Sequence, residues 1–459
     1  MADRGDFMEL QAERISSDGS SVGRLSDGMT VFIAGALPGE RVRARITARK
    51  KSYAVAVAEE ILEAHPSRVT PPCPVYHRCG ACQLQHASYP LQLELKRAIL
   101  EDAFRRICKR PFPEIPPCIP SPDQTGYRNK VSLPVREAGG LPAMGYYARG
   151  SHDIVPMKSC PVAAKLIDRA FATVSAALPA LGIPAYDERS GKGVLRHAIF
   201  RHGIKTGELL VSLVIASPLK ARQKNRLEEQ LVTRLKSGFP GLRSFTLNLN
   251  RSPGNVITGL ETETILGDGL VEEELSPFRF ECDTTSFFQV NTCQARAMYD
   301  YAARAGGVAE SANVLELYAG SGGLTAFLAG AAGRVTAVEE WPPAVSLMES
   351  NMERNGMKER VTIAPGAVEK VIPDLEESFD LVVLDPPRTG CTPDVLRGVL
   401  SLKPSTIVYV SCNPATLARD AATLVDGGYS IESLTCFDMF PQTVHVETVA
   451  VLSIGHCRF

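Results

Sequence analysis

The stretch VLELYAGSGGLTAFL, from Val314 to Leu328, constrains the fold more than any other part of the chain. An apolar run leads into the glycine-rich turn 320–323, and a helix-forming segment follows directly. This order predicts a strand, a tight turn and a helix N-terminus, which together let a ligand approach the backbone. Such turns are also plain connections in many α/β domains, so the turn alone does not establish a binding site.

Three further apolar runs favour a binding site, because each ends in a polar turn. They are Arg334–Val338 before Glu339, Phe379–Leu384 before Asp385-Pro386-Pro387-Arg388, and Ile407–Val410 before Ser411-Cys412-Asn413-Pro414. Strands of this kind, mostly separated by helical patterns, predict a doubly wound α/β sheet with ligands beyond the carboxyl ends of its strands. Glu339 follows the glycine turn at the distance where a carboxylate accepts hydrogen bonds from both ribose hydroxyls of a nucleoside. The turn lacks the third glycine of the dinucleotide motif GxGxxG, so it favours S-adenosylmethionine over NAD.

Length and charge set broad limits on the protein. The 459 residues are enough for about two to four domains. Because 50 Lys and Arg balance 51 Asp and Glu, any surface that binds nucleic acid must be a local patch. No apolar run reaches the length of a membrane span, and the beginning, MADRGDFMEL, lacks the apolar region of a secretion signal. We therefore expect a cytoplasmic protein with no membrane partner, and we expect it to be a monomer.

The cysteines divide into one cluster and a scattered set. In a reducing compartment cysteines do not form a disulfide framework, so each is a metal ligand, a nucleophile or a small buried residue. For the scattered cysteines, a small buried residue is the default interpretation. The positions are Cys73, Cys79, Cys82, Cys108, Cys118, Cys160, Cys282, Cys293, Cys391, Cys412, Cys436 and Cys457.

The cluster has the spacing C-x5-C-x2-C, from Cys73 through Cys79 to Cys82, with Gly80 and Ala81 keeping the turn small. Cys160 is the best candidate for a fourth ligand because a proline follows it, as in iron–sulfur loops. The spacing favours a metal centre over packed thiols. Four thiolates suit both an iron–sulfur cluster and zinc, and both remain open at this point.

The region before the cysteine cluster reads as a small β-barrel, from about Met8 to His65, with short β-type runs between turns. Its last long run carries six cations without an acid between them, which favours either a phosphate-contacting edge or a solvated strand face. These cations are Arg41, Arg43, Arg45, Arg49, Lys50 and Lys51.

After the cluster, the pattern predicts a helix over about 91–108, a proline-rich linker over 111–122, and a β-rich region from 126 to about 280. Basic and aromatic residues alternate in the β-rich region, as in proteins that stack on unpaired bases, although the same aromatic residues are equally typical of a core. The most concentrated are Tyr127, Arg128, Lys130, Arg136, Tyr146 and Tyr147.

Cys412 and Glu447 are the candidate catalytic pair. Cys412 follows a buried strand, and the helix that starts at Asn413-Pro414 can lower the pKa of its thiol. Glu447 directly precedes the apolar run Thr448–Ile454, where a carboxylate is costly unless it has a function or a partner. Either residue alone would be read as a packed thiol or a surface acid. Together with a methyl donor they suit methylation of uracil, in which a thiolate adds to carbon 6 and a base later removes the proton from carbon 5.

With these residues the chain resembles the RNA uracil-5 (5-methyluridine) methyltransferases, most closely the RumA-like branch that acts on 23S rRNA. The resemblance spans nearly the whole chain and rests on VGRL and LPGE in an N-terminal TRAM-type barrel, CGAC with Cys160, FFQVN, LELYAGSGG, DPPR, SCNPATLARD and FPQTVHVE. It implies an α/β fold in which a Rossmann-like S-adenosylmethionine-dependent methyltransferase domain follows an OB-like TRAM barrel and a β-rich central domain. The expected boundaries are 1–65, 66–120 for the cluster loop, helix and linker, 121–280 for the central RNA-binding domain, and 281–459.

The resemblance also implies the roles of individual residues. Cys412 would be the nucleophile and Glu447 the general base, and a 4Fe-4S cluster would be bound by Cys73, Cys79, Cys82 and Cys160. Positions that hold S-adenosylmethionine in the family correspond to Gln289, Tyr318, Glu339 and Asp385, beside the turn glycines Gly320, Gly322 and Gly323. Two positions depart from the family: Gly323 stands where relatives often carry asparagine, so one donor to the methionine part of the cofactor is in doubt, and Ala81 stands where glycine is common.

Several alternatives stay open. The same reaction on tRNA is the nearest, because related proteins with this barrel and cluster serve both RNAs. A methyltransferase acting on an exocyclic base nitrogen would carry an aromatic residue where Arg388 stands. A cytosine-5 enzyme would also use a cysteine, but the arrangement with Glu447 fits uracil better. An RNA-binding or redox-sensing protein with an inactive methyltransferase fold would have no reason to keep both Cys412 and Glu447.

Overall fold

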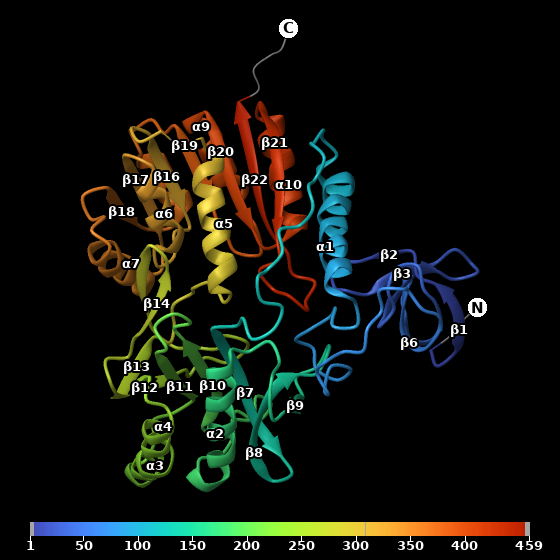
Figure 1. Ribbon diagram of the computed structural model, residues 1–459, viewed down its shortest axis with the longest axis vertical. Coiled ribbons are helices and arrows are strands. Elements are labelled where there is room, and N and C mark those ends of the chain that lie inside the picture. The colour runs from blue at the N-terminus through green and yellow to red at the C-terminus, as the bar shows by residue number, and fades with distance from the viewer. Residues whose placement is uncertain (1–3, 308, 455–459) are drawn as a thin grey trace.

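The computed structural model describes residues 4–307 and 309–454, in which three sheets of six or seven strands form three lobes (Figure 1). Cys457 and the outermost residues of the expected first and last domains lie outside the described residues. No helix within the described ranges is long and apolar enough to cross a membrane.

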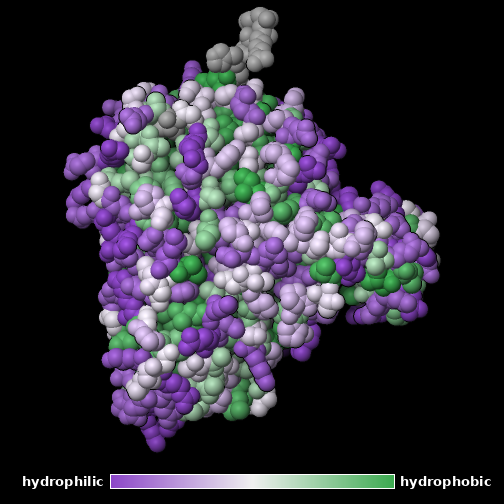
Figure 2. Space-filling model, viewed as in Figure 1, coloured by the Kyte–Doolittle hydropathy of each residue, from purple (hydrophilic) through white to green (hydrophobic). Residues whose placement is uncertain are grey.

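The first lobe is a six-stranded curled sheet, which we call the N-terminal barrel (residues 7–63). Its strand order is β1-β5-β6-β4-β3-β2. Alternate residues of the long strand β5 are buried, as expected where one face of a strand packs on a core. The strands are β1 (Phe7–Gln11), β2 (Arg14–Ile15), β3 (Ser21–Arg24), β4 (Thr30–Ala34), β5 (Arg41–Arg49) and β6 (Tyr53–Glu63). Figure 2 shows the barrel as a lobe beside the main body, with hydrophilic and hydrophobic residues mixed over its surface.

Helix α1 (Tyr89–Ala103) connects the barrel to the body and continues as a π-helical turn, Phe104–Cys108. The predicted helix over 91–108 is therefore confirmed, and the proline-rich segment 111–122 contains no helix or strand.

The second lobe is a seven-stranded sheet with the order β13-β12-β11-β10-β7-β8-β9. Its strands are β7 (Lys130–Ala138), β8 (Leu141–Tyr147), β9 (Ile154–Pro156), β10 (Leu195–His202), β11 (Leu209–Ile215), β12 (Leu242–Leu249) and β13 (Glu261–Leu266). Its helical segments are α2 (Lys165–Leu181), α3 (Ala221–Leu227), the π-helical Glu228–Val232 and α4 (Thr233–Gly238). The hairpin of β14 (Val271–Leu275) and β15 (Phe278–Cys282) leads into the third lobe.

The third lobe is the predicted α/β sheet, with the order β18-β17-β16-β19-β20-β22-β21. The first five strands in that order are parallel, and β22 is antiparallel to both of its neighbours. The strands are β16 (Asn313–Leu317), β17 (Arg334–Glu339), β18 (Val361–Pro365), β19 (Leu381–Leu384), β20 (Thr406–Ser411), β21 (Tyr429–Phe437) and β22 (Glu447–Ile454). The helices are α5 (Thr292–Ala305), α6 (Gly323–Ala331), α7 (Pro342–Arg354), α8 (Val368–Val371), a 3-10 turn at Ile372–Asp374, α9 (Pro393–Leu402) and α10 (Pro414–Asp426).

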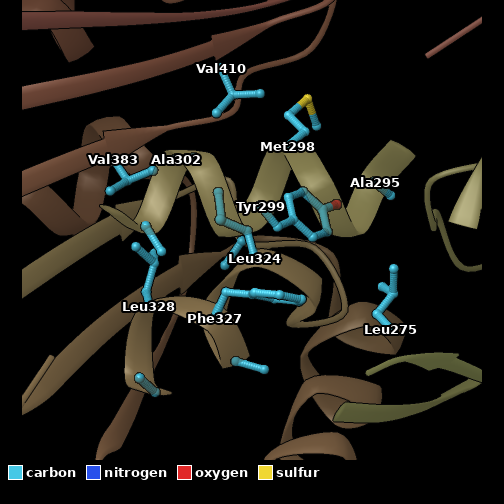
Figure 3. Packing of buried hydrophobic residues seen from close by; sticks show 14 of the residues in the cluster. Leu275, Ala295, Met298, Tyr299, Ala302, Leu324, Phe327, Leu328, Val383 and Val410 are labelled. Atoms are coloured by element: carbon cyan, nitrogen blue, oxygen red, sulfur yellow. The ribbon is translucent and has the colours of Figure 1, made fainter. Parts of the chain in front are cut away.

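Helices cover both faces of this sheet, which explains why its strands read as continuous apolar runs. On one face, α5, α6 and α7 pack in one core; Figure 3 shows Met298 and Ala302 of α5 directed toward Val410 and Val383 of the sheet. On the other face, α9 and α10 pack together with α1, whose Leu100 is fully buried there. The N-terminal third of the chain therefore completes the core of the C-terminal sheet.

Candidate active site

A pocket of about 320 Å³ opens at the carboxyl edge of the parallel strands, where a doubly wound sheet binds its ligands. The glycine turn after β16, the turn after β19 and the turn after β20 all reach it. Of the residues predicted from the sequence, seven line it: Gln289, Tyr318, Gly320, Gly323, Asp385, Cys412 and Glu447. Gly322 and Glu339 lie outside its lining.

Strand register brings Cys412 and Glu447 together although 34 residues lie between them in the sequence. Strands β20 and β22 are antiparallel neighbours, and Ser411 pairs with Thr448. Cys412 directly follows Ser411, the last residue of β20, and Glu447 directly precedes Thr448 as the first residue of β22. Both side chains line the same pocket, because the end of one strand and the start of the other meet at one sheet edge.

The charges around Cys412 act in opposite directions on its thiol. Burial, followed by the neighbouring Glu447, raises the pKa of Cys412 to about 11. Arg388, which also lines the pocket, lowers that pKa because its positive charge favours the thiolate. Arg388 is therefore the group in the pocket that stabilises a thiolate at this position.

Three carboxyl groups line the pocket: those of Glu316 and Glu447 are buried, and that of Asp385 is partly buried. Burial raises the pKa of Asp385 to about 7 and that of Glu316 to about 8, and it holds the pKa of Glu447 well above its usual range. Oε2 of Glu316 has no hydrogen-bond partner. Since buried carboxylates are costly without a counter-charge, the pocket is suited to a cationic ligand, such as one with a sulfonium and an amino group.

The glycine turn has the backbone shape that the sequence requires. Gly320 and Gly322 have φ of +60° and +87°, and a Cβ on Gly322 would lie 2.9 Å from side-chain atoms of Met348 and Met352. Glu339 supports the turn, because its carboxylate accepts hydrogen bonds from the backbone N–H groups of Gly320 and Trp341, both at 2.8 Å. The structure thus shows Glu339 bound to the backbone of the turn, and its predicted contact with a ribose remains a prediction.

The space beside Gly323 is taken by a neighbouring ring. A Cβ at this position would lie 3.2 Å from Cε2 of Tyr299, so the chain has little room for the asparagine that relatives often carry here. Tyr299 lines the pocket, as does Gln289.

Four residues that line the pocket were not predicted from the sequence: Glu316, Phe288, Tyr299 and Arg388. An acid inside an apolar strand was a usable signal for Glu316, because such a residue is rarely placed there without a function. Tyr299 had no such signal, since an aromatic residue on an amphipathic helix is usually part of a core.

The four predicted cluster ligands, Cys73, Cys79, Cys82 and Cys160, line one small cavity. Within the described ranges, however, no group of three or more His, Cys, Asp or Glu side chains is arranged to hold a metal ion. Burial raises the pKa of Cys79, Cys160 and Cys82, the last to about 11, and the guanidinium of Arg128 lowers all three.

Two predicted RNA-contacting sets have other partners in the structure. Arg41, Arg43 and Arg45 form ion pairs with glutamates of β1 and β6, so β5 does not present an unopposed positive edge. Tyr127 is buried and donates to the carbonyl of Pro441, and Lys130 donates to the carbonyls of Thr284 and Ser286. For Tyr127 the core alternative is the correct one, because burial keeps its ring from stacking on a base.

Comparisons with known proteins agree with this geometry. A family model described as tRNA (Uracil-5-)-methyltransferase matches residues 193–454, and a TRAM domain model matches residues 3–58. The chain is 37% identical over 454 residues to an uncharacterized RNA methyltransferase of Halalkalibacterium halodurans, covering 98% of each chain. It is 38% identical over 450 residues to another of Gloeobacter violaceus, covering 98% of this chain and 97% of that one.

Among solved structures, the chain is similar to the Pyrococcus abyssi tRNA (uracil-54, C5)-methyltransferase in complex with S-adenosyl-L-homocysteine. The TM-score is 0.76 at 27% identity, covering 97% of this chain and 100% of that one. The chain therefore belongs to the tRNA (uracil-5-)-methyltransferase family and is a TRAM-containing, S-adenosylmethionine-dependent RNA methyltransferase.

Proposed function

We propose that the protein transfers a methyl group from S-adenosylmethionine to carbon 5 of a uridine in 23S rRNA through a covalent Cys412–uracil intermediate. The observation that supports this most strongly is that Cys412, Glu447 and the glycine turn share one pocket. The reaction needs a nucleophile, a base and a methyl donor, and one pocket has room to bring all three to a single base.

In the proposed reaction, the Cys412 thiolate forms a bond to carbon 6 of uracil, and the electron pair of the 5,6 double bond moves to carbon 5. S-adenosylmethionine, when bound, would supply the methyl group to carbon 5, and its sulfonium sulfur would leave as a neutral thioether when the methyl–sulfur bond breaks. Arg388 favours the thiolate because it lowers the pKa of Cys412. Gln289, Tyr318, Asp385 and the turn glycines would position the cofactor.

Glu447 completes the reaction. Its carboxylate takes the proton from carbon 5, the double bond re-forms, and the bond between Cys412 and carbon 6 breaks. Burial raises the pKa of Glu447, which makes its carboxylate a stronger base than an exposed one. A base in this position decides whether the covalent adduct is released.

The choice between rRNA and tRNA rests on different observations. The motif resemblance favours 23S rRNA. The second candidate is tRNA, because the family model and the Pyrococcus abyssi enzyme are both described by a tRNA substrate. We expect RNA to be bound by a monomer in the cytoplasm, with the N-terminal barrel contributing to the contact.

The test uses purified protein, labelled S-adenosylmethionine, and unmodified 23S rRNA and tRNA in parallel. We expect the labelled methyl group at uridine carbon 5 of the rRNA. Label in tRNA alone would show that tRNA is the substrate, and label in neither RNA would refute the proposal. Cys412→Ala should abolish turnover. Glu447→Gln should permit methylation but trap a covalent RNA adduct, and normal turnover of this variant would show that the base lies elsewhere.

We also propose that Cys73, Cys79, Cys82 and Cys160 hold a 4Fe-4S cluster. Their spacing and their shared cavity support it, and so does the cation of Arg128 beside them, because four thiolates on a cluster leave negative charge in the cavity. In such a cluster each thiolate binds a different iron, so the thiols need not converge on one ion. A bound cluster would tie residues 73–82 to Cys160, and no step of the methyl transfer passes through it.

Iron and sulfide content after anaerobic purification tests the cluster. Cys160→Ser should lower both, whereas Cys293→Ser, which changes an exposed cysteine, should leave both unchanged. Zinc in place of iron, or protein free of both, would refute the assignment.

A further inference from the structure

The loop 438–446 joins β21 to β22 and ends at Glu447. Connecting segments usually run over the surface, because buried backbone groups need hydrogen-bond partners. Most of this loop is nevertheless buried, including Met439, Gln442 and Val446. Its backbone partners must therefore come from other parts of the fold.

Most of the partners outside the loop come from the first third of the chain, and three of them, Gln83, Leu84 and Gln92, meet at Gln442. The carbonyl of Gln442 accepts hydrogen bonds from the backbone N–H groups of Gln83 and Leu84, at 3.1 and 3.0 Å. Gln83 directly follows Cys82. The side chain of Gln83 donates back to the carbonyl of Gly80 at 2.8 Å, and its Oε1 accepts from the N–H of Val444 at 3.4 Å. The cysteine-rich segment is thus bonded directly to this loop.

Helix α1 holds the same residue from another side. The N–H of Gln442 donates to Oε1 of Gln92 at 2.9 Å, and Nε2 of Gln92 donates to Oε1 of Gln442 at 3.1 Å. The side chain of Gln442 also donates to the carbonyl of Gln124. Figure 1 shows the loop below β21 and β22 reaching the lower end of α1.

The backbone of Gln442 is itself strained, with φ of +72°. A residue other than glycine adopts this conformation only where the surroundings impose it, and such residues gather at functional sites. The hydrogen bonds from Gln83, Leu84 and Gln92 are the surroundings that impose it here. Because Phe437 pairs with Glu447, the loop closes at the carboxylate proposed as the base.

We propose that Gln442 is a positioning residue for Glu447: it fixes the loop 438–446 to the cysteine-rich segment and α1, and thereby sets the geometry of proton removal from carbon 5. This inference rests on the proposed function of Glu447 as the base. The competing possibility is that β20 and β21, which flank β22, hold Glu447 in place without the loop.

The experiment compares Gln442→Gly, Gln92→Leu and Glu94→Gln. Gln442→Gly permits the positive φ and removes the hydrogen bonds of the Gln442 side chain. Gln92→Leu removes the hydrogen-bond partner of Gln442 on α1 and leaves the loop sequence unchanged. Glu94→Gln, the control, changes an exposed position of the same helix. Loss of buried hydrogen bonds of this kind should slow adduct release roughly tenfold in the first two variants. Covalent RNA adduct should then accumulate while S-adenosylmethionine affinity stays at the wild-type value. Glu94→Gln should behave as wild type.

Hydrogen exchange of the RNA-free protein tests the positioning role of Gln442 independently of the proposal that Glu447 is the base. Amides of residues 443–447 should exchange faster in Gln442→Gly and Gln92→Leu than in the control. If exchange rises but Glu447→Gln traps no adduct, the base assignment is wrong and the loop contact stands. Wild-type exchange and wild-type adduct levels in both variants would overturn the inference. It would also be overturned if both variants lost cofactor affinity and melted at a lower temperature without accumulating covalent adduct.

Discussion

The affinity for S-adenosylmethionine should rise with pH between 6 and 8. Burial raises the pKa of Asp385 to about 7 in the free protein, so much of this carboxyl group is protonated at neutral pH. A bound cation favours the ionised form and lowers the pKa, so binding must release a proton. The affinity should therefore be lost as the pH falls through the pKa of the free protein.

The size of the effect follows from that pKa. With a pKa of about 7, the ionised fraction of Asp385 falls from roughly nine-tenths at pH 8 to roughly one-tenth at pH 6. If the cofactor binds only the ionised form, its affinity should drop roughly tenfold over this range, or about 1.4 kcal/mol. Glu316, whose pKa burial raises to about 8, can add to the effect in the same direction.

Isothermal titration calorimetry in buffers of different ionisation enthalpy measures both the affinity and the released proton. Asp385→Asn should bind more weakly at pH 8 and show a smaller pH dependence than the wild-type protein. The amino group of the ligand titrates in the same range, but it does so equally with both proteins, so the difference between them isolates Asp385. Equal affinity at pH 6 and pH 8, or net proton uptake by the wild-type protein, would refute the reasoning.

Two further predictions concern other charged groups. Arg388→Met should raise the pH at which the covalent adduct forms at half its maximal rate, because Arg388 lowers the pKa of Cys412. The rate of adduct formation against pH, measured in a Glu447→Gln background, tests this, and an unchanged profile would contradict the role of Arg388. Lys96→Met should lower the free energy of unfolding by about 3–5 kcal/mol, because Lys96 and Asp438 form a fully buried ion pair and the carboxylate would be left alone. Urea unfolding measures this loss, and Lys96→Met with Asp438→Leu should recover much of it.

The sequence predicted the parts of the site that lie at the ends of strands. The predicted strands Arg334–Val338, Phe379–Leu384 and Ile407–Val410 correspond to β17, β19 and β20 within two residues at each end. Their polar ends meet at one edge because parallel strands share a direction, which a local pattern is enough to indicate. Glu447 was expected at the start of a strand because the apolar run Thr448–Ile454 follows it, and it is the first residue of β22.

The parts that the sequence did not predict depend on contacts between distant segments. Gln92 and Gln442 are 350 positions apart, and no local periodicity relates them. The acids that pair with Arg41, Arg43 and Arg45 lie on neighbouring strands, so counting charges along one strand missed them. Buried tyrosines such as Tyr127 look the same in a sequence as tyrosines that stack on RNA.

The placement of α1 has a consequence for how the protein is made. Leu100 and the π-helical Phe104 complete a core whose other members include Leu417 and Leu452, which the ribosome adds more than three hundred residues later. During synthesis this apolar face of α1 stays exposed to solvent until the C-terminal part of the chain has left the ribosome. Neither half can be expressed alone without exposing it, so attempts to produce the catalytic sheet as an isolated fragment should yield aggregates unless residues 89–108 accompany it.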